Sequence, residues 1–229
     1  MKDAICNQVF EQMAIAPNSS ADHNAGFLLG CGTRRRHSDS VQLFRTARPQ
    51  ARSTAIRECL PSEAWQQLDE AVRRAHEPGT GMHGPFRVEH GRGKVARLLA
   101  RLARLPPPSE SVEACLRIAA DGDREHWQRS FGGHSFHTMQ WCEPGGFIVE
   151  RRNSIQLRFR LRVAGGALRY EQAGAAFCLG PIRLPLPHWL APHVEAIEEP
   201  AGAGRVRVRV SVTLPFVGLL IAYEGEVTP

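Results

Sequence analysis

Two segments of this chain alternate strictly between apolar and polar side chains, and no other feature constrains the fold as much. Residues 155–163 read IQLRFRLRV, and residues 206–214 read VRVRVSVTL. Successive side chains of a strand point to opposite faces, so this alternation predicts strands with one buried and one solvated face, as in antiparallel sheets. We therefore expect the arginines of both segments to point to solvent, and we expect the two strands not to pair with like charges opposed.

The regions around these strands complete the expected architecture. Glycine-rich turns separate further strands at residues 145–146, 165–166 and 202–204. No long helical pattern follows residue 112, which argues against parallel βαβ units. Helical signals come earlier, between residues 61 and 78 and between residues 94 and 105. The expected fold is α+β: a mainly antiparallel, curved β-sheet that forms a half-barrel, with two N-terminal helices.

The second helical segment is basic and amphipathic. Its apolar side chains form one stripe, at Val95, Leu98, Leu99, Leu102 and Leu105. A helix of this kind can lie on a membrane surface. We instead expect the stripe to pack across the sheet while the arginines beside it stay solvated, so membrane-surface contact is not expected.

The charge is spread evenly along the chain. The net charge of +6 divides into 7 basic and 4 acidic side chains in residues 1–56, and 22 basic and 19 acidic in residues 57–229. A balance of +3 in each part is too weak for a nucleic-acid footprint, so no nucleic-acid partner is expected. Residues 1–56 show no sustained period of 3.6 or 2. We interpret them as disordered or outside the domain, which is predicted over residues 57–229.

The cysteines indicate a reducing compartment. The chain has six, scattered and without a C-x-x-C pair. A disulfide framework is typical of short secreted chains with clustered cysteines. Reduced, mostly buried thiols are therefore expected, and no apolar run approaches the roughly 18 residues that would span a bilayer. Together these features predict a soluble, cytoplasmic protein.

Several sequences that look like known functional motifs lie in a context that does not fit those functions. Residues 79–84 read GTGMHG, but they follow a helix and lead into a strand, the reverse of a dinucleotide fingerprint. His134 and His137 would face opposite sides of a strand, which does not suit a metal pair. No phosphate loop and no nucleophile elbow is present. We therefore assign no cofactor, no metal and no catalytic residue.

One predicted strand has an unusual face. Glu125, Trp127, Arg129 and Phe131 alternate along it and share a side. Aromatic side chains mixed with charges do not suit a plain core, but they suit the lining of a partly wet cavity inside a curved sheet. The alternative is a structural Glu–Arg pair beneath a packed tryptophan.

The two charges on this face need other partners. Four residues of strand separate Glu125 from Arg129 by about 13 Å, too far for a direct pair. Because a buried unpaired charge is costly, we expect a carboxylate beside Arg129, with Glu150 and Glu195 as candidates. Arg151 or a ligand is expected beside Glu125.

Several motifs resemble those of a known family. They are EHWQRSFG at 125–132, VER at 149–151, LPHWLAP at 186–192 and LPFVG at 214–218. From about His76 to the C-terminus the chain resembles the bacterial DUF4166 family, whose function is unknown. Some members of that family resemble C-terminal attachments to NAD-binding Rossmann-type proteins, which implies an accessory role beside an oxidoreductase.

Three functional hypotheses follow. The first is a non-enzymatic binding module for a small apolar or amphipathic, lipid-like ligand. The second is an accessory domain that docks on a Rossmann-type NAD-dependent oxidoreductase, and the third is an enzyme that uses Glu125, Arg129 and Glu150. A deep cavity favours the first or the third, while a filled interior with an exposed apolar patch favours the second. The candidate ligand-binding residues are Glu125, Trp127, Arg129, Phe131, Glu150, Arg151 and Trp189.

Overall fold

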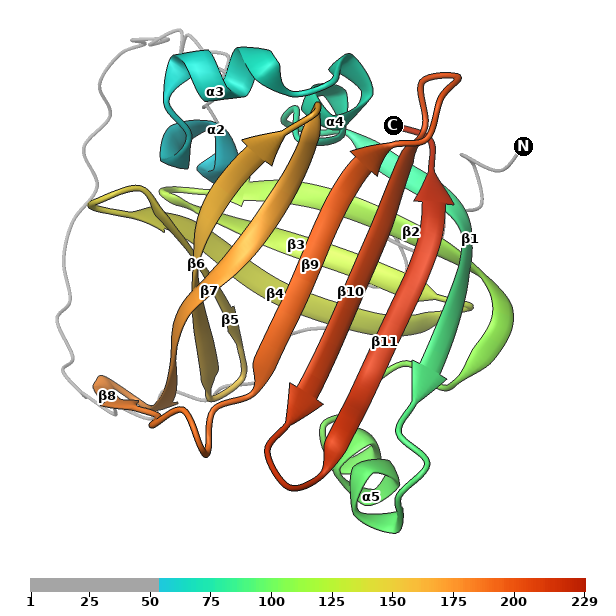
Figure 1. Ribbon diagram of the computed structural model, residues 1–229, viewed down its shortest axis with the longest axis vertical. Helices are drawn as coiled ribbons and strands as arrows, with labels where there is room; N and C mark the ends of the chain where they lie inside the picture. Colours follow the sequence, from blue (N-terminus) through green and yellow to red (C-terminus); the bar gives the residue numbers. More distant parts are fainter. Residues whose placement is uncertain (1–53) are drawn as a thin grey trace, which may run out of the picture. The chain divides into compact units, whose positions relative to one another are not determined.

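Antiparallel strands account for most of the described chain, which comprises residues 54–229 of a computed structural model (Figure 1). The strands are β1 (Gly81–His90), β2 (Ser109–Asp121), β3 (Arg124–Phe131), β4 (His134–Glu143), β5 (Phe147–Arg152), β6 (Ile155–Ala164), β7 (Ala167–Leu179), β8 (Ile182–Pro185), β9 (His193–Pro200), β10 (Val206–Leu214) and β11 (Gly218–Val227). The helices are α2 (Ala55–Cys59), α3 (Ser62–Gln67), α4 (Glu70–Ala75) and α5 (Lys94–Leu102). The stretch 1–56, predicted to be disordered or outside the domain, lies outside the described residues apart from residues 54–56, so that interpretation stays a prediction.

The sheet closes on itself. Its hydrogen-bonded order is β6-β5-β4-β3-β2-β1-β11-β10-β9-β7-β8, and β6 also pairs with β7. Ten of the eleven strands therefore form a closed antiparallel ring, and the short β8 extends β7 outside it. The predicted half-barrel is wrong: the fold is a closed β-barrel with few helices. Inward and outward residues alternate in open and closed sheets alike, so the pattern could not reveal that the last strand, β11, pairs with β1.

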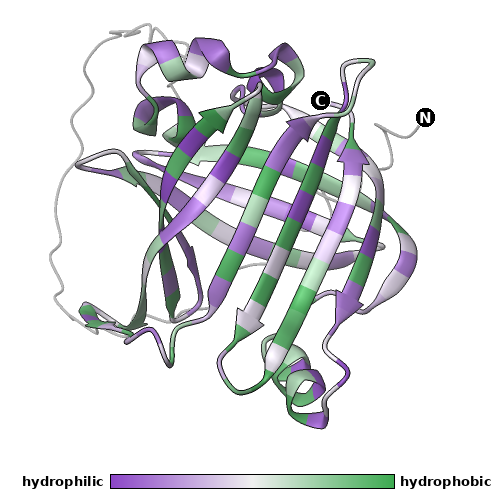
Figure 2. Ribbon diagram, in the orientation of Figure 1, coloured by the Kyte–Doolittle hydropathy of each residue, from purple (hydrophilic) through white to green (hydrophobic). Residues whose placement is uncertain are grey.

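Hydrophobic and hydrophilic residues alternate along the strands (Figure 2). Phe159 of β6 and Val206 of β10 are buried, whereas none of the arginines at positions 158, 160, 162, 207 and 209 is buried. Strands β6 and β10 are not neighbours. Carboxylates accompany the outer arginines, as where Arg209 lies 3.0 Å from Glu199. The expected direction of the arginines is confirmed.

Helices α2, α3 and α4 cover one end of the barrel, which we call the capped end (Figure 1). Ile56 of α2 and Val72 of α4 are fully buried. The main chain of Asp69 donates to the carbonyl of Gly166 in the β6–β7 turn at 3.0 Å. The sequence predicted one helix here, but the chain breaks between α3 and α4, where Asp69 caps α4 by accepting from the Ala71 amide at 2.8 Å.

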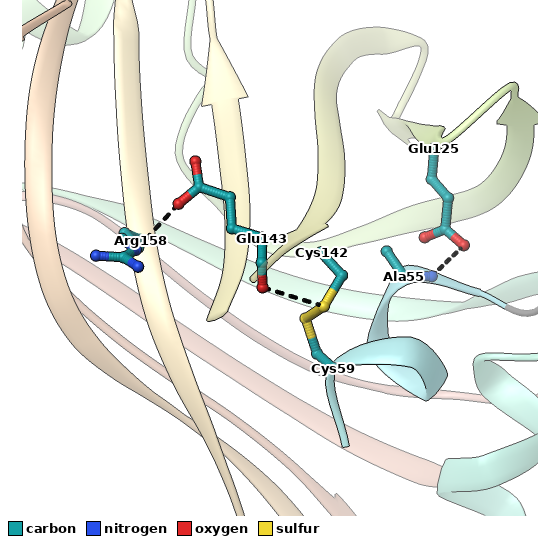
Figure 3. The surroundings of a disulfide bond; sticks show 6 residues. All are labelled: Ala55, Cys59, Glu125, Cys142, Glu143 and Arg158. Atoms are coloured by element: carbon teal, nitrogen blue, oxygen red, sulfur yellow. Dashed lines mark hydrogen bonds and ion pairs between the residues drawn. A yellow bond between two sulfur atoms is a disulfide. The ribbon is translucent and has the colours of Figure 1, made fainter. Parts of the chain in front are cut away.

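A disulfide ties the cap to the barrel. It joins Cys59 of α2 to Cys142 of β4 across a sequence separation of 83 residues, with the two Cα atoms 5.5 Å apart (Figure 3). The expectation of reduced thiols is wrong for this pair, while Cys178 is a buried free thiol. A pairing over so long a separation cannot be deduced from spacing alone.

The opposite end carries α5 and the β7–β8 hairpin, and we call it the open end (Figure 1). Helix α5 buries only Ala96 and Ala100. Val95, Leu98 and Leu102 are exposed, Leu102 to 72%. The expected packing of the apolar stripe across the sheet is therefore wrong. Within residues 54–229, no helix combines the length and the apolar character needed to cross a membrane.

Candidate functional site

Packed side chains fill most of the barrel interior and leave a cavity of about 60 Å³. Aromatic rings form much of its wall: Trp127, Phe131, Phe159, Tyr170 and Tyr223. The rings of Phe131 and Tyr223 contact each other at a tilt, with their centroids 5.4 Å apart. These rings come from β3, β6, β7 and β11, so the closed ring of strands is what brings them together. Such a wall offers apolar contact to whatever occupies the cavity.

Arg129 supplies the positive charge at this cavity. Its guanidinium donates to the Thr138 hydroxyl at 2.8 Å, and the same group reaches Glu150 at 3.5 Å. The ring of Trp127 lies 5.0 Å from the guanidinium carbon. A guanidinium has five N–H donors, and the side-chain hydrogen bonds of Arg129 within residues 54–229 go to Thr138 and Glu150. The expected carboxylate partner of Arg129 is confirmed, and it is Glu150.

Gln140, which lines the same cavity, has an unpaired buried acceptor. Its side chain is 2% exposed and lines the cavity. Among the described residues no group donates to its Oε1 atom. An unsatisfied buried acceptor costs about 1–3 kcal/mol. A molecule that donates to this oxygen would recover that free energy.

A second group of hydrogen-bonded polar side chains extends from the cap to the cavity wall. The Nε2 atom of His76 lies 2.6 Å from Glu198, and the Tyr170 hydroxyl donates to the other Glu198 oxygen at 3.0 Å. Burial alone would raise the pKa of Glu198, but the His76 charge and these hydrogen bonds lower it. Burial and the neighbouring carboxylate raise the pKa of Tyr170 well above its usual value. Burial likewise raises the pKa of Tyr223 to about 12.

Glu125 occupies a separate place, toward the cap. It accepts from the Ala55 amide at 2.9 Å (Figure 3) and from the Trp127 indole at 3.2 Å. Burial raises its pKa, although these two hydrogen bonds act against that shift. The expected partner, Arg151 or a ligand, is replaced by the first turn of α2. Glu125 does not line the cavity beside Arg129.

The structure brings together four of the seven predicted ligand-binding residues. Trp127, Arg129, Phe131 and Glu150 line the cavity. Arg151 instead donates to the carbonyl of Asn153 at 3.1 Å in the turn after β5. Trp189, in the loop before β9, is 62% exposed.

Sequence reasoning missed the polar residues Gln140, Tyr170 and Glu198. Each is a polar residue at an inward position, within strands that also carry apolar inward residues. Only the register of β9 against β7 places Glu198 inside. His76 was missed because it lies beyond α4, where no period applies.

A larger hollow of about 720 Å³ lies on the outer face of β7, β9, β10, β11 and β1. It is lined by charges of both signs, including Arg87, Glu195, Arg209 and Glu224. Several of these side chains pair locally, as Arg87 does with Glu89 at 3.1 Å. Self-paired, exposed charges are ordinary features of an outer sheet face, so the interior cavity is the better candidate site.

The fold and site define a class of domain: a closed antiparallel β-barrel with ionisable groups packed at its centre and helices over one end. The chain belongs to the family described as a domain of unknown function (DUF4166), whose model matches residues 68–227. The resemblance found in the sequence is thereby confirmed. No curated protein matches the chain.

Two solved structures are similar to this chain. One is a protein of unknown function from the DUF3598 family of Nostoc punctiforme, with 11% identity and a TM-score of 0.41 over 66% of this chain and 46% of that one. The chain thus spans less than half the length of that protein. The other is a secretory abundant heat soluble protein from Ramazzottius varieornatus, with 10% identity and a TM-score of 0.33 over 66% of this chain and 93% of that one.

Proposed function

We propose that this domain is a non-enzymatic binding module that holds a small amphipathic molecule in the cavity beside Trp127 and Arg129. One observation carries the proposal: Gln140 lines the cavity, and its buried Oε1 atom has no donor among the described residues. Binding sites are mostly apolar, with a few convergent polar groups that fix the ligand's orientation. Gln140 as acceptor and Arg129 as donor provide such groups within a wall of aromatic rings.

The volume of the cavity limits the ligand. It measures about 60 Å³, against roughly 150 Å³ for a cavity that accepts benzene. A lipid-like ligand needs several hundred cubic ångströms and is not proposed. The ligand is instead a short alcohol, amide or carboxylic acid of a few heavy atoms. Its polar end donates to Gln140 and accepts from Arg129, and its hydrocarbon part contacts the rings.

The enzyme hypothesis is less well supported. Its three residues do not converge, because Glu125 is held by Ala55 and Trp127 and does not line the cavity. Arg129 and Glu150 remain as a single ion pair at 3.5 Å. General acid–base chemistry needs a group within hydrogen-bond reach of the reacting atoms. Docking on an oxidoreductase stays a prediction of the family resemblance.

The cellular compartment belongs to the same proposal. A cytoplasmic location was predicted from the expectation of reduced thiols. The Cys59–Cys142 disulfide weighs against it, because such bonds persist mainly in oxidising compartments. We therefore favour a compartment in which this bond is stable.

The test is thermal stability of the purified chain titrated with short alcohols, amides and carboxylic acids, beside native mass spectrometry for a co-purified molecule. At least one class should raise the melting temperature in a saturable way, since a ligand of the native state stabilises it by mass action. Gln140→Met and Ala196→Val should remove that rise, the first by deleting the acceptor and the second by filling the cavity that Ala196 lines. No rise with any class, and no co-purified molecule, would refute the proposal.

A further inference from the structure

The exposed apolar side chains of the described chain gather at the open end. Ten large hydrophobic residues are exposed: Val95, Leu98, Leu102, Phe177, Leu179, Ile182, Leu184, Trp189, Leu190 and Phe216. All ten fall in α5, in the β7–β8 hairpin with the loop that follows it, or in the β10–β11 turn. Phe216, at the tip of that turn, is 93% exposed.

The strand register places these segments at one end of the molecule. His90, the last residue of β1 before α5, pairs with Ile221, close to the β10–β11 turn. His193, the first residue of β9 after the Trp189 loop, pairs with Thr213, just before the same turn. Strand β7 runs antiparallel to β9, so its hairpin with β8 lies there too. Figure 1 shows the three projections at the end opposite α2, α3 and α4.

The projecting segments of the open end are basic, although Arg183 pairs with Glu143 of β4 at 3.3 Å and Glu89 and Glu110 lie nearby on β1 and β2. Residues 91–105, 177–192 and 213–220 contain six arginine or lysine residues and no aspartate or glutamate. Residues 54–77, which form the cap, contain five acidic residues and three basic ones. The projecting segments of the open end and the segment that forms the cap therefore differ in charge as well as in apolar exposure.

A basic hollow of about 420 Å³ lies beside the exposed face of α5. Leu102, Arg104, His137 and Arg152 are among its lining residues. The Arg152 guanidinium lies over the ring of Phe136 at 4.4 Å and makes no ion pair with any residue between 54 and 229. Burial, together with the Arg129 and Arg152 charges, lowers the pKa of His137. Arg152 also donates to the Arg104 carbonyl at 3.2 Å, so within residues 54–229 no carboxylate pairs with the positive charge of this hollow.

We infer that the open end docks on an anionic phospholipid surface. Helix α5 lies along the interface with Leu98 and Leu102 in the acyl region, Trp189 and Phe216 anchor neighbouring projections, and the hollow at Arg152 accepts a lipid phosphate. Interfacial helices combine an apolar face with lysines and arginines, and tryptophan is typical of the interfacial belt. A fluid bilayer can surround three separate apolar tips. A protein partner would instead need a surface that is complementary in shape to all three and that also carries acidic residues.

The expectation that membrane contact would be absent depended on burial of the α5 stripe, and that burial does not occur. The inference is independent of the ligand proposed for the interior cavity. Each can fail without the other, because the two sites share no lining residue.

Co-sedimentation of the full chain with vesicles tests the inference. Vesicles of phosphatidylcholine with phosphatidylserine should bind the protein, salt should release it, and pure phosphatidylcholine should bind it weakly. Leu98→Glu should weaken binding by about tenfold or more, from the loss of one buried leucine alone. Gln67→Glu on the exposed surface of α3 makes the same charge change at the other end and should bind as the unmodified chain does. Arg152→Gln should weaken binding and reduce its salt dependence.

Two outcomes would overturn the inference. One is an absence of binding to phosphatidylserine vesicles. If, in that case, the chain self-associates and Leu98→Glu makes it monomeric, the surface binds a second copy of the chain instead. The other is an equal weakening of vesicle binding by Leu98→Glu and Gln67→Glu, which would show that binding depends on the net charge of the chain and not on the α5 surface. Both positions are exposed, so unchanged melting temperatures should accompany both variants.

Discussion

At the capped end of the barrel, α2 and α4 bury Ile56 and Val72, and a disulfide holds α2 against β4. At the open end, α5 buries two alanines and leaves Leu98 and Leu102 in solvent. Both ends have short helices next to strand turns, yet only the capped end uses its helices to extend the core. The helices of the capped end thus contribute to stability, whereas the apolar side chains of the open end are available for binding.

This difference also explains the position of the interior polar groups. His76, just beyond α4, reaches Glu198 in β9, and Ala55 of α2 holds Glu125 in β3. The cap thereby adds a second hydrogen-bond partner to each of two carboxylates that the strands supply with one, Tyr170 for Glu198 and Trp127 for Glu125. Removal of the cap would expose these carboxylates and the apolar residues beneath it together.

Of the features that distinguish the capped end from the open end, the disulfide should make the largest contribution to stability. Cys142→Ser opens the cross-link across 83 residues, and the loop-entropy model assigns such a link about 4.5 kcal/mol. Urea unfolding under oxidising conditions should show a loss of that order. Reductant should lower the stability of the unmodified chain to that of Cys142→Ser. It should leave the stability of Cys142→Ser unchanged. Insensitivity of the unmodified chain to reductant would show that the cap does not depend on this bond.

A matched pair of truncations should separate the two ends. Ile56→Ala at the capped end should cost about 2–5 kcal/mol, because a fully buried side chain is lost from the core. Leu98→Ala at the open end should change the free energy of unfolding by less than about 0.5 kcal/mol, because the side chain is already exposed. Urea titrations of both variants measure this contrast. Similar losses in the two would show that α5 also contributes to the core.

Parts of this contrast could be predicted from the sequence. Alternation in β6 and β10 fixed the direction of their arginines, and the mixed face of β3 predicted that Trp127 and Arg129 line a cavity. Closure of the barrel could not be predicted, because it depends on pairing between β1 and β11 from opposite ends of the domain. An apolar stripe also looks the same whether its helix packs on a sheet or faces solvent, so the exposure of α5 was not predictable.

Two carboxylates below the cap, Glu198 and Glu125, should each make the free energy of unfolding depend on pH, and the two dependences should have opposite signs. The pKa of Glu198 is lowered from 4.5, so the stability from this carboxylate is present above that pH and is lost as the pH falls through the lower folded value. The pKa of Glu125 is raised from 4.5, so its ionisation reduces stability as the pH rises through the folded value.

Unfolding free energies measured across acidic pH should resolve the two effects. Glu198→Gln should flatten the loss of stability below about pH 4.5, and Glu125→Gln should flatten the decline above it, both following from the linkage of proton binding to folding. Leu98→Ala at the open end, where no carboxylate lies on α5, should leave the whole profile parallel to that of the unmodified chain. Parallel profiles for all three variants would mean that the cap does not control these carboxylates.

A small gain of stability is expected at Gln140, whose substitution changes the interior cavity and neither end. Gln140→Met keeps a similar volume and removes the unpaired Oε1 acceptor. In ligand-free protein it should raise the free energy of unfolding by about 1 kcal/mol, the lower end of the desolvation cost of an unsatisfied group. With a saturating ligand the sign should reverse, because only the unmodified chain has the acceptor that the ligand uses. A loss of stability in ligand-free protein would show that Oε1 is already satisfied, and the polar groups of the cavity would then be structural.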